Sequence, residues 1–344
     1  MGPVSDVPAE QREGVGIAIR RTWLKLVSAP EIAPLALLLV LSAVFQRTNP
    51  AFLSTLNISN FLQYVPELGI VALGMTLLLV GGELDLSVGA VFGFAPVIVA
   101  VLVDQTGLRF EVAFAIVIAI CALIGFANGQ LVTRFRMSSF IVTIGMMMIV
   151  RGTALYVSDG FPQSTFNTVS PIKTLLIGRI AHVGDFTLLS SLIWYLGLAA
   201  LAHTLLTNTR FGNWIMATGG NLEAAKARGV ATDRVKIVLF VVSSVLACVA
   251  GTMNGLRVLA VFAIAGTGQE LEVIAMTVIG GTLLGGGRGT IVGTVIGVLL
   301  LRVIRNGIIM VGVPGLAYNI FIGAIIIGQM VIHSVITRRQ VGES

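Results

Sequence analysis

The sequence predicts an all-α protein that crosses a membrane about ten times. Of its 344 residues, 56% are hydrophobic and only 11% are charged, whereas a soluble domain usually carries about 25% charged residues. Many apolar runs approach the roughly 20 residues that a helix needs to cross the hydrocarbon core. Because that core offers no water to the backbone, helices are the expected structure for these runs.

Apolar length and polar breaks define the expected spans, although Gly-Gly and Gly-Gly-Gly interrupt the second, third, eighth and ninth. Together they form one membrane domain, 31–336, between an N-terminal segment, 1–30, and a tail, 337–344. The ten spans are expected at 31–46, 62–81, 85–103, 110–132, 138–157, 187–206, 236–256, 272–285, 289–312 and 315–336.

The distribution of Lys and Arg predicts that both termini lie in the cytoplasm. Cytoplasmic segments of membrane proteins carry an excess of these residues, and this orientation places most of the 22 Lys and Arg on the inner side. The net charge of +6 therefore reflects topology and not nucleic-acid binding. Two connecting loops are long, 158–186 outside and 207–235 inside, and we expect one soluble partner at each; plain connectors are the alternative.

Several other classes of site are not expected. Cys121 and Cys248 lie inside apolar runs and are predicted to be free, buried thiols, and the three histidines have no metal-ligand spacing. The run "GGGRGT" at 285–290 lacks the Lys of a phosphate loop, so we expect no nucleotide site and no cofactor. The first apolar run begins near Ile32, too far in for a cleavable signal peptide.

The inner loop is predicted to hold a short helix. Asn221 suits the N-cap and Gly229 the C-cap, and an acidic residue near the start with basic residues near the end matches the helix dipole. Two small alanines would let another protein approach closely, and an ordinary connecting helix is the alternative. The residues expected to dock a partner are Gly220, Asn221, Glu223, Ala224, Ala225, Lys226, Arg228 and Gly229.

This loop resembles the EAA loop of ABC importer permeases, because Glu-Ala-Ala is followed by Gly six residues after the Glu. In that family the short helix fits a groove on the ATPase subunit and couples its closure to the membrane helices. The flanking "TRFG" at 209–212 and the "GGN-EAA-G" pattern ending at Gly229 resemble the permeases of the ribose, xylose and arabinose group. The Leu-Pro end of the wider pattern is absent, so the resemblance is not to the maltose-type permeases.

Two glycine-rich stretches extend the resemblance over nearly the whole chain. "GGELDLSVG" at 81–89 is similar to the family's GG-x-DLSVG signature, with Glu83 where a Gly is common. The stretch 274–297 resembles a second family pattern, in which Gly289, Gly293 and Gly297 are expected to pack helices closely, within or between subunits. The Met-Thr and Gly-Gly of 75–82 recur at 276–281, by an old internal repeat or by coincidence.

Candidate residues for a solute pathway or gate come from two places. Asp85 and Ser87 can each cap the following helix, and a direct role in the pathway is the alternative. Arg302 and Arg305 fall in the ninth span, where each cation costs ~2.5–3.5 kcal/mol. We expect them to face a wet cavity or to pair with acids, Asp85 or Glu83, unless they reach an interface. The full set is Glu83, Asp85, Ser87, Gly89, Arg302, Arg305 and Asn306.

The resemblance implies a permease subunit that performs no covalent chemistry. It would move a monosaccharide or similar small polyhydroxylated solute inward across a bacterial plasma (inner) membrane, as a multi-pass protein. Its partners would be an ATPase subunit inside, a substrate-binding protein outside and a second permease copy, identical or homologous. One alternative is an ion-coupled secondary transporter that uses Glu83 and Asp85. Another is an ABC permease for branched-chain amino acids, against which "DLSVG" argues.

Overall fold

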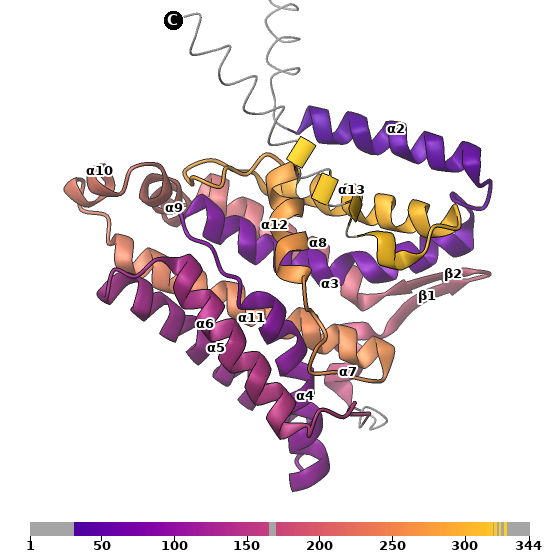
Figure 1. The fold of residues 1–344 in the computed structure, drawn as a ribbon, viewed down its shortest axis with the longest axis horizontal. Coiled ribbons are helices and arrows are strands. Elements are labelled where there is room, and N and C mark those ends of the chain that lie inside the picture. The colour runs from indigo at the N-terminus through magenta and orange to yellow at the C-terminus, as the bar shows by residue number, and fades with distance from the viewer. Residues whose placement is uncertain (1–30, 165–169, 319, 322, 325–326, 329–344) are drawn as a thin grey trace, which may run out of the picture.

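The computed structural model describes residues 31–164, 170–318, 320–321, 323–324 and 327–328, and helices dominate it (Figure 1). Within these residues, seven helices are long and apolar enough to cross a membrane, which agrees with a polytopic all-α class. They are α3 (Thr55–Val80), α4 (Val88–Thr106), α5 (Phe110–Arg134), α6 (Ser139–Val157), α8 (Ser190–Asn208), α11 (Thr232–Val258) and α13 (Ile291–Met310).

The remaining three expected spans differ from this set. The first is α2 (Ile32–Thr48), an apolar helix of 17 residues. The eighth is α12 (Gln269–Ile279), which has 11 residues because Gly280 and Gly281 end it early. The tenth begins with the short 3-10 helix η1 (Gly315–Ala317), and most of the rest of it lies outside the described residues, as do the two terminal segments. A count of ten spans therefore stays a prediction.

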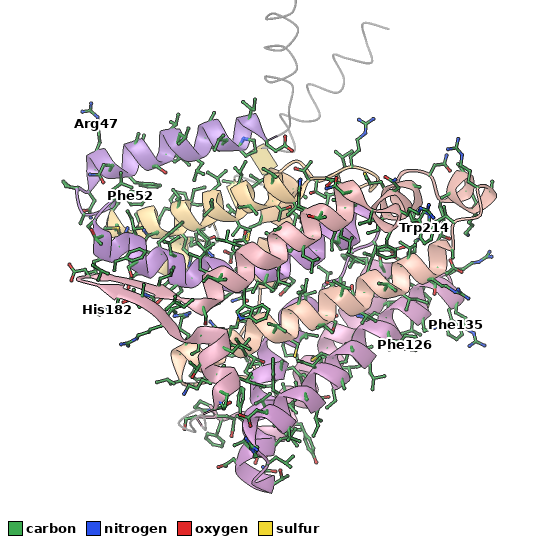
Figure 2. All side chains as sticks on the ribbon, turned by 180° about the vertical axis from the view of Figure 1, so that it is seen from behind. Arg47, Phe52, Phe126, Phe135, His182 and Trp214 are labelled. Atoms are coloured by element: carbon green, nitrogen blue, oxygen red, sulfur yellow. The ribbon has the colours of Figure 1, made fainter. Side chains whose placement is uncertain are left out.

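Helix α3 forms the centre of the bundle. It packs against α11, α8, α13 and α12, and its second half is buried on all sides, as expected of a helix that is apolar all round. Close packing needs small residues here, since a Cβ on Gly69 would lie 2.5 Å from the ring of Tyr195. By contrast, α5 and α6 expose apolar side chains such as Phe126, which Figure 2 shows at the margin of the bundle. Cys121 and Cys248 are buried and free, as predicted.

Two Gly-Gly turns end α3 and α12 in the same way. The second glycine of each pair is left-handed, with φ of 82° at Gly82 and 93° at Gly281. In each turn the next N–H reaches back to a helix carbonyl, from Glu83 to Leu78 and from Thr282 to Thr277, both at 3.1 Å. This is the Schellman arrangement, which satisfies carbonyls at a helix end. The recurrence of Met-Thr and Gly-Gly in the sequence is thus matched by a recurrence in backbone geometry.

The two long loops lie at opposite ends of the bundle (Figure 1). One holds α7 (Pro171–Ile177) and an antiparallel hairpin of β1 (Arg179–Val183) and β2 (Phe186–Leu189), a small sheet that the sequence did not predict. The other holds α9 (Arg210–Gly220) and α10 (Leu222–Ala227). Seen from behind, His182 of β1 and Trp214 of α9 mark these two ends (Figure 2).

Candidate functional site

The predicted short helix of the inner loop is present as α10, and its caps are as expected. The Asn221 side chain accepts the N–H of Ala224 at 3.0 Å, and Gly229 is left-handed with φ of 81°. The Glu223 side chain is 85% exposed and lies 3.8 Å from Lys226. Ala225 is buried against its own chain, so of the two alanines only Ala224 is available to a partner.

A cluster of five glycines anchors α10 to the bundle; we call it the glycine junction. It joins the end of α9 to the turn after α3 and to the loop between α12 and α13. A Cβ on Gly219 would lie 2.0 Å from the carbonyl oxygen of Val80, so only glycine allows this approach. The members are Gly82, Gly219, Gly220, Gly286 and Gly287.

Backbone contacts between main chains hold the glycine junction together. The N–H of Gly287 donates to the carbonyl of Val80 at 2.8 Å. A Cβ on Gly287 would lie 2.6 Å from the Cα of Gly220, and one on Gly286 would lie 2.8 Å from the Cα of Gly82. The two residues that precede the N-cap of α10, Gly219 and Gly220, therefore touch the loops that follow α3 and α12. Of the five, only Gly220 was among the residues predicted to dock a partner, although each of the three segments contains a run of glycines.

The "DLSVG" turn is a buried hydrogen-bonded unit. Asp85 is fully buried, and its Oδ1 accepts the N–H of Ser87 at 2.8 Å and the Ser87 hydroxyl at 2.5 Å. Asn128 of α5 donates to Ser87 Oγ at 3.0 Å. Ser87 is the N-cap residue of α4, but its side chain makes no capping bond. Asp85 therefore satisfies one N–H at the helix start. The capping expected from Ser87 is wrong, because its hydroxyl donates to Asp85 and accepts from Asn128 instead.

Neutralising Asp85 while keeping its shape tests this role. We expect Asp85→Asn to retain most uptake, because an amide oxygen still accepts the Ser87 N–H. Asp85→Leu would leave the buried N–H and hydroxyl of Ser87 without their acceptor, at about 1–3 kcal/mol for each group. The measurements are solute uptake and the melting temperature of the purified protein. Equal loss of uptake in both variants, at unchanged melting temperature, would instead assign a function to the charge.

Glu83 links this turn to α11, where it pairs with Lys236. The turn is also held by α6, since the N–H of Leu86 donates to Thr143 Oγ1 at 3.1 Å. Glu83 and Lys236 line a cavity of about 650 Å³ beside α10, together with basic residues such as Arg134 and Arg136. Gly89 packs elsewhere, because a Cβ there would lie 2.1 Å from Glu270 Oε2.

Arg302 and Arg305 do pair with an acid, but it is neither Asp85 nor Glu83. Both guanidinium groups lie beside Glu272 of α12, at 4.0 and 3.9 Å. Tyr318 donates a hydrogen bond to the same carboxylate at 2.8 Å. The expected partners are wrong because they belong to the turn after α3, whereas α12 packs directly along α13.

A second buried ion pair, which was not predicted from the sequence, lies nearby. Glu67 of α3 accepts Arg257 Nε at 2.5 Å and Asn254 Nδ2 at 2.7 Å. Arg257 also stacks over the ring of Tyr64, 4.1 Å from its centroid. The sequence does carry a signal, because Glu67 is an acid within the second expected span. Arg257 lies just beyond the expected span 236–256, but α11 continues through it.

The two ion-paired groups border one cavity of about 380 Å³, which we call the polar chamber. It lies between α3, α11, α13 and the start of α12, and it brings together three predicted pathway residues: Arg302, Arg305 and Asn306. Asp85, Ser87 and Gly89 are not among its lining residues. The lining comprises Asn60, Phe61, Tyr64, Glu67, Asn254, Arg257, Gln269, Arg302, Arg305, Asn306 and Ile309.

The glycines that were predicted to pack helices closely make their contacts with residues of the same chain. A Cβ on Gly293 would lie 1.9 Å from the carbonyl oxygen of Gly280, and one on Gly297 would lie 2.0 Å from that of Met276. Gly289 fits against Val80 and Thr282 in the same way. These small residues let α13 approach α12 closely, as small residues spaced by four do in membranes. Among the described residues, no group of His, Cys, Asp and Glu gathers in a way that could hold a metal.

Comparison with known proteins identifies the family. Residues 57–330 match the family described as "Branched-chain amino acid transport system / permease component". The ribose import permease of Escherichia coli (strain K12) is 35% identical over 89% of this chain and 92% of its own length. The xylose/arabinose import permease of Sulfolobus acidocaldarius is 33% identical over 85% of this chain and 82% of its own length. No solved structure matches. The chain therefore belongs to this family of ABC importer permeases, multi-pass membrane subunits whose ATP hydrolysis is performed by separate chains.

Proposed function

We propose that this chain is the membrane subunit of an ABC importer that moves a monosaccharide of the ribose, xylose or arabinose class into the cell. The relatives named above support this class of solute. The observation that carries the transport mechanism is the anchoring of α10. An exposed helix that can receive a partner is held, through the glycine junction, against the turns that end α3 and α12.

In this mechanism an ATPase subunit docks on α10 in the cytoplasm. With the predicted ten spans, six before this loop and four after it, both chain termini lie on the same side. Movement of α10 reaches the turn before α4 and the loop before α13, because Gly219 has no free space beside Val80 and Gly82. A substrate-binding protein docks at the opposite end, over the loop that carries the β1–β2 hairpin. A second permease copy, identical or homologous, completes the pathway, and the chain itself forms one domain over 31–336.

Reconstitution tests the proposal directly. The chain is placed in liposomes with its ATPase and its binding protein, and uptake of ribose, xylose, arabinose and leucine is measured. We expect that a pentose is taken up. This uptake should depend on ATP and on both partners, and it should not depend on an ion gradient. Pentose uptake that persists without the ATPase would contradict the importer mechanism. Uptake of leucine in place of a sugar would establish the amino-acid alternative.

A further inference from the structure

We propose that the polar chamber binds the sugar during transport, through hydrogen bonds to the hydroxyl groups of the sugar. The chamber would then be an intermediate binding site, between the substrate-binding protein and the end of the bundle that carries α10. This inference rests on the proposed function and adds a site to it. The chamber lies at the level of the membrane helices, since its walls include Glu67 of α3 and Arg302 of α13. A polar cavity at that depth is a candidate for a solute pathway, because intramembrane ionisable groups are costly and are kept mainly for function.

Pairing of charges alone does not account for the chamber. Glu67 with Arg257, and Glu272 with Arg302, would hold their helices together equally well without a cavity between them. Instead, a space of about 380 Å³ stays open beside them, which is within the size range of small-molecule sites. The ion pairs fix the positions of the polar groups, and the cavity leaves room for a ligand to reach them.

The chamber also presents polar atoms that lack protein partners. The Asn306 amide, which is half-buried, and the Asn60 amide, which is exposed, have no hydrogen-bond partner in the described part of the chain. Each amide offers both a donor and an acceptor, which suits a ligand whose hydroxyls act as both. Gln269 Oε1 and Arg302 Nε also lack a hydrogen bond, but both atoms are enclosed by their neighbours.

The charged and apolar groups of the chamber suit a branched-chain amino acid less well than a sugar. Of the two carboxylates near the chamber, Glu67 accepts hydrogen bonds from Arg257 and Glu272 is ion-paired with Arg302, so an ammonium group would find no unpaired carboxylate there. The apolar side chains of the lining are Phe61 and Ile309, beside the ring of Tyr64. Arg257 covers the ring of Tyr64, so recognition depends on hydrogen bonds and not on stacking at that ring.

Protection of an introduced thiol tests the site in the assembled transporter. Asn306→Cys places a thiol in the chamber, and a membrane-impermeant thiol reagent is added from the outside. Cys121 and Cys248 are fully buried, so they give little background. We expect D-ribose or D-xylose to slow labelling several-fold, and leucine or cyclopentanol to leave the rate unchanged. Thr48→Cys, exposed at the end of α2, is the control that no solute protects.

A second variant, Asn60→Cys, repeats the measurement from α3 and covers the case in which the first variant does not assemble. Sugar protection at either chamber position, with none at Thr48→Cys, supports the inference. If labelling is equal with and without sugar while ATP-driven uptake continues, the chamber is not an intermediate binding site and the proposed function stands. If the unmodified complex shows no sugar uptake, the proposed function fails instead.

Discussion

Replacing Gly219 with valine is expected to abolish ATP-driven uptake, and alanine is expected to reduce it strongly. Even a Cβ would lie 2.0 Å from the carbonyl oxygen of Val80 and 2.8 Å from the nitrogens of Gly82 and Gly287. All three neighbours are backbone atoms, so no side chain can rotate away. Either α9 must move off the two turns or the turns must open.

The size of the effect follows from the cost of overpacking. Extra atoms in a well-packed site cost typically about 1–3 kcal/mol, and a coupling free energy of that size corresponds to about a 5- to 150-fold change. We expect Gly219→Ala to fall in this range and Gly219→Val to exceed it. The measurements are uptake, ATP hydrolysis with and without the binding protein, and the amount of ATPase retained by the purified complex.

A change in coupling must be separated from a failure to fold. Gly197→Ala in α8 is the matched control, because nothing lies within 4 Å of its Cβ position, and it should transport normally. If Gly219→Ala assembles with the ATPase, hydrolyses ATP and no longer takes up sugar, the junction transmits the movement of α10. Uptake equal to that of the unmodified chain would show that the backbone contacts at Gly219 do not matter.

The sequence predicted the elements well where apolar length and capping residues decide them. Both caps of α10 follow from the chemistry of Asn221 and Gly229, which is local in the chain. The packing of α13 on α12 follows from the spacing of Gly293 and Gly297, although spacing alone left open whether the partner was the same subunit. In the structure the partner is the same chain.

The candidate site was predicted less completely, because its contacts join residues far apart in the sequence. Arg302 was assigned to a wet cavity or an acid, and both are present, but the acid is Glu272 and not Asp85. The free-energy cost of a cation within a membrane span shows that Arg302 needs a partner, but it does not show which residue is the partner. The pairing of Glu67 with Arg257 could not be predicted, because Glu67 lies within the second expected span and Arg257 lies just beyond the seventh. The glycine junction likewise depends on three segments that meet only in the fold.

The second large effect is expected from changing the exposed surface of α10. In the double variant Glu223→Lys with Gly229→Trp, we expect ATPase binding and uptake to be lost. Glu223 is exposed at the start of the helix, and a reversed charge there is unfavourable with the helix dipole by roughly 0.3–1 kcal/mol. Gly229 is left-handed, a conformation that costs other residues roughly 1–2 kcal/mol. Nothing lies within 4 Å of its Cβ position, so an indole would project away from the chain into the space of a docked partner.

We expect this variant to reach the membrane with a melting temperature lowered by only a few degrees, to retain little ATPase and to lose uptake. Glu223→Asp with Gly229→Asn is the conservative control, since Asp keeps the charge and Asn tolerates the left-handed conformation; it should transport. Loss of ATPase binding in the double variant, with binding retained in Gly219→Ala, would separate the docking surface from the internal link. Normal uptake by the double variant would remove α10 from the mechanism, because no partner could seat an indole and a reversed charge in the same groove.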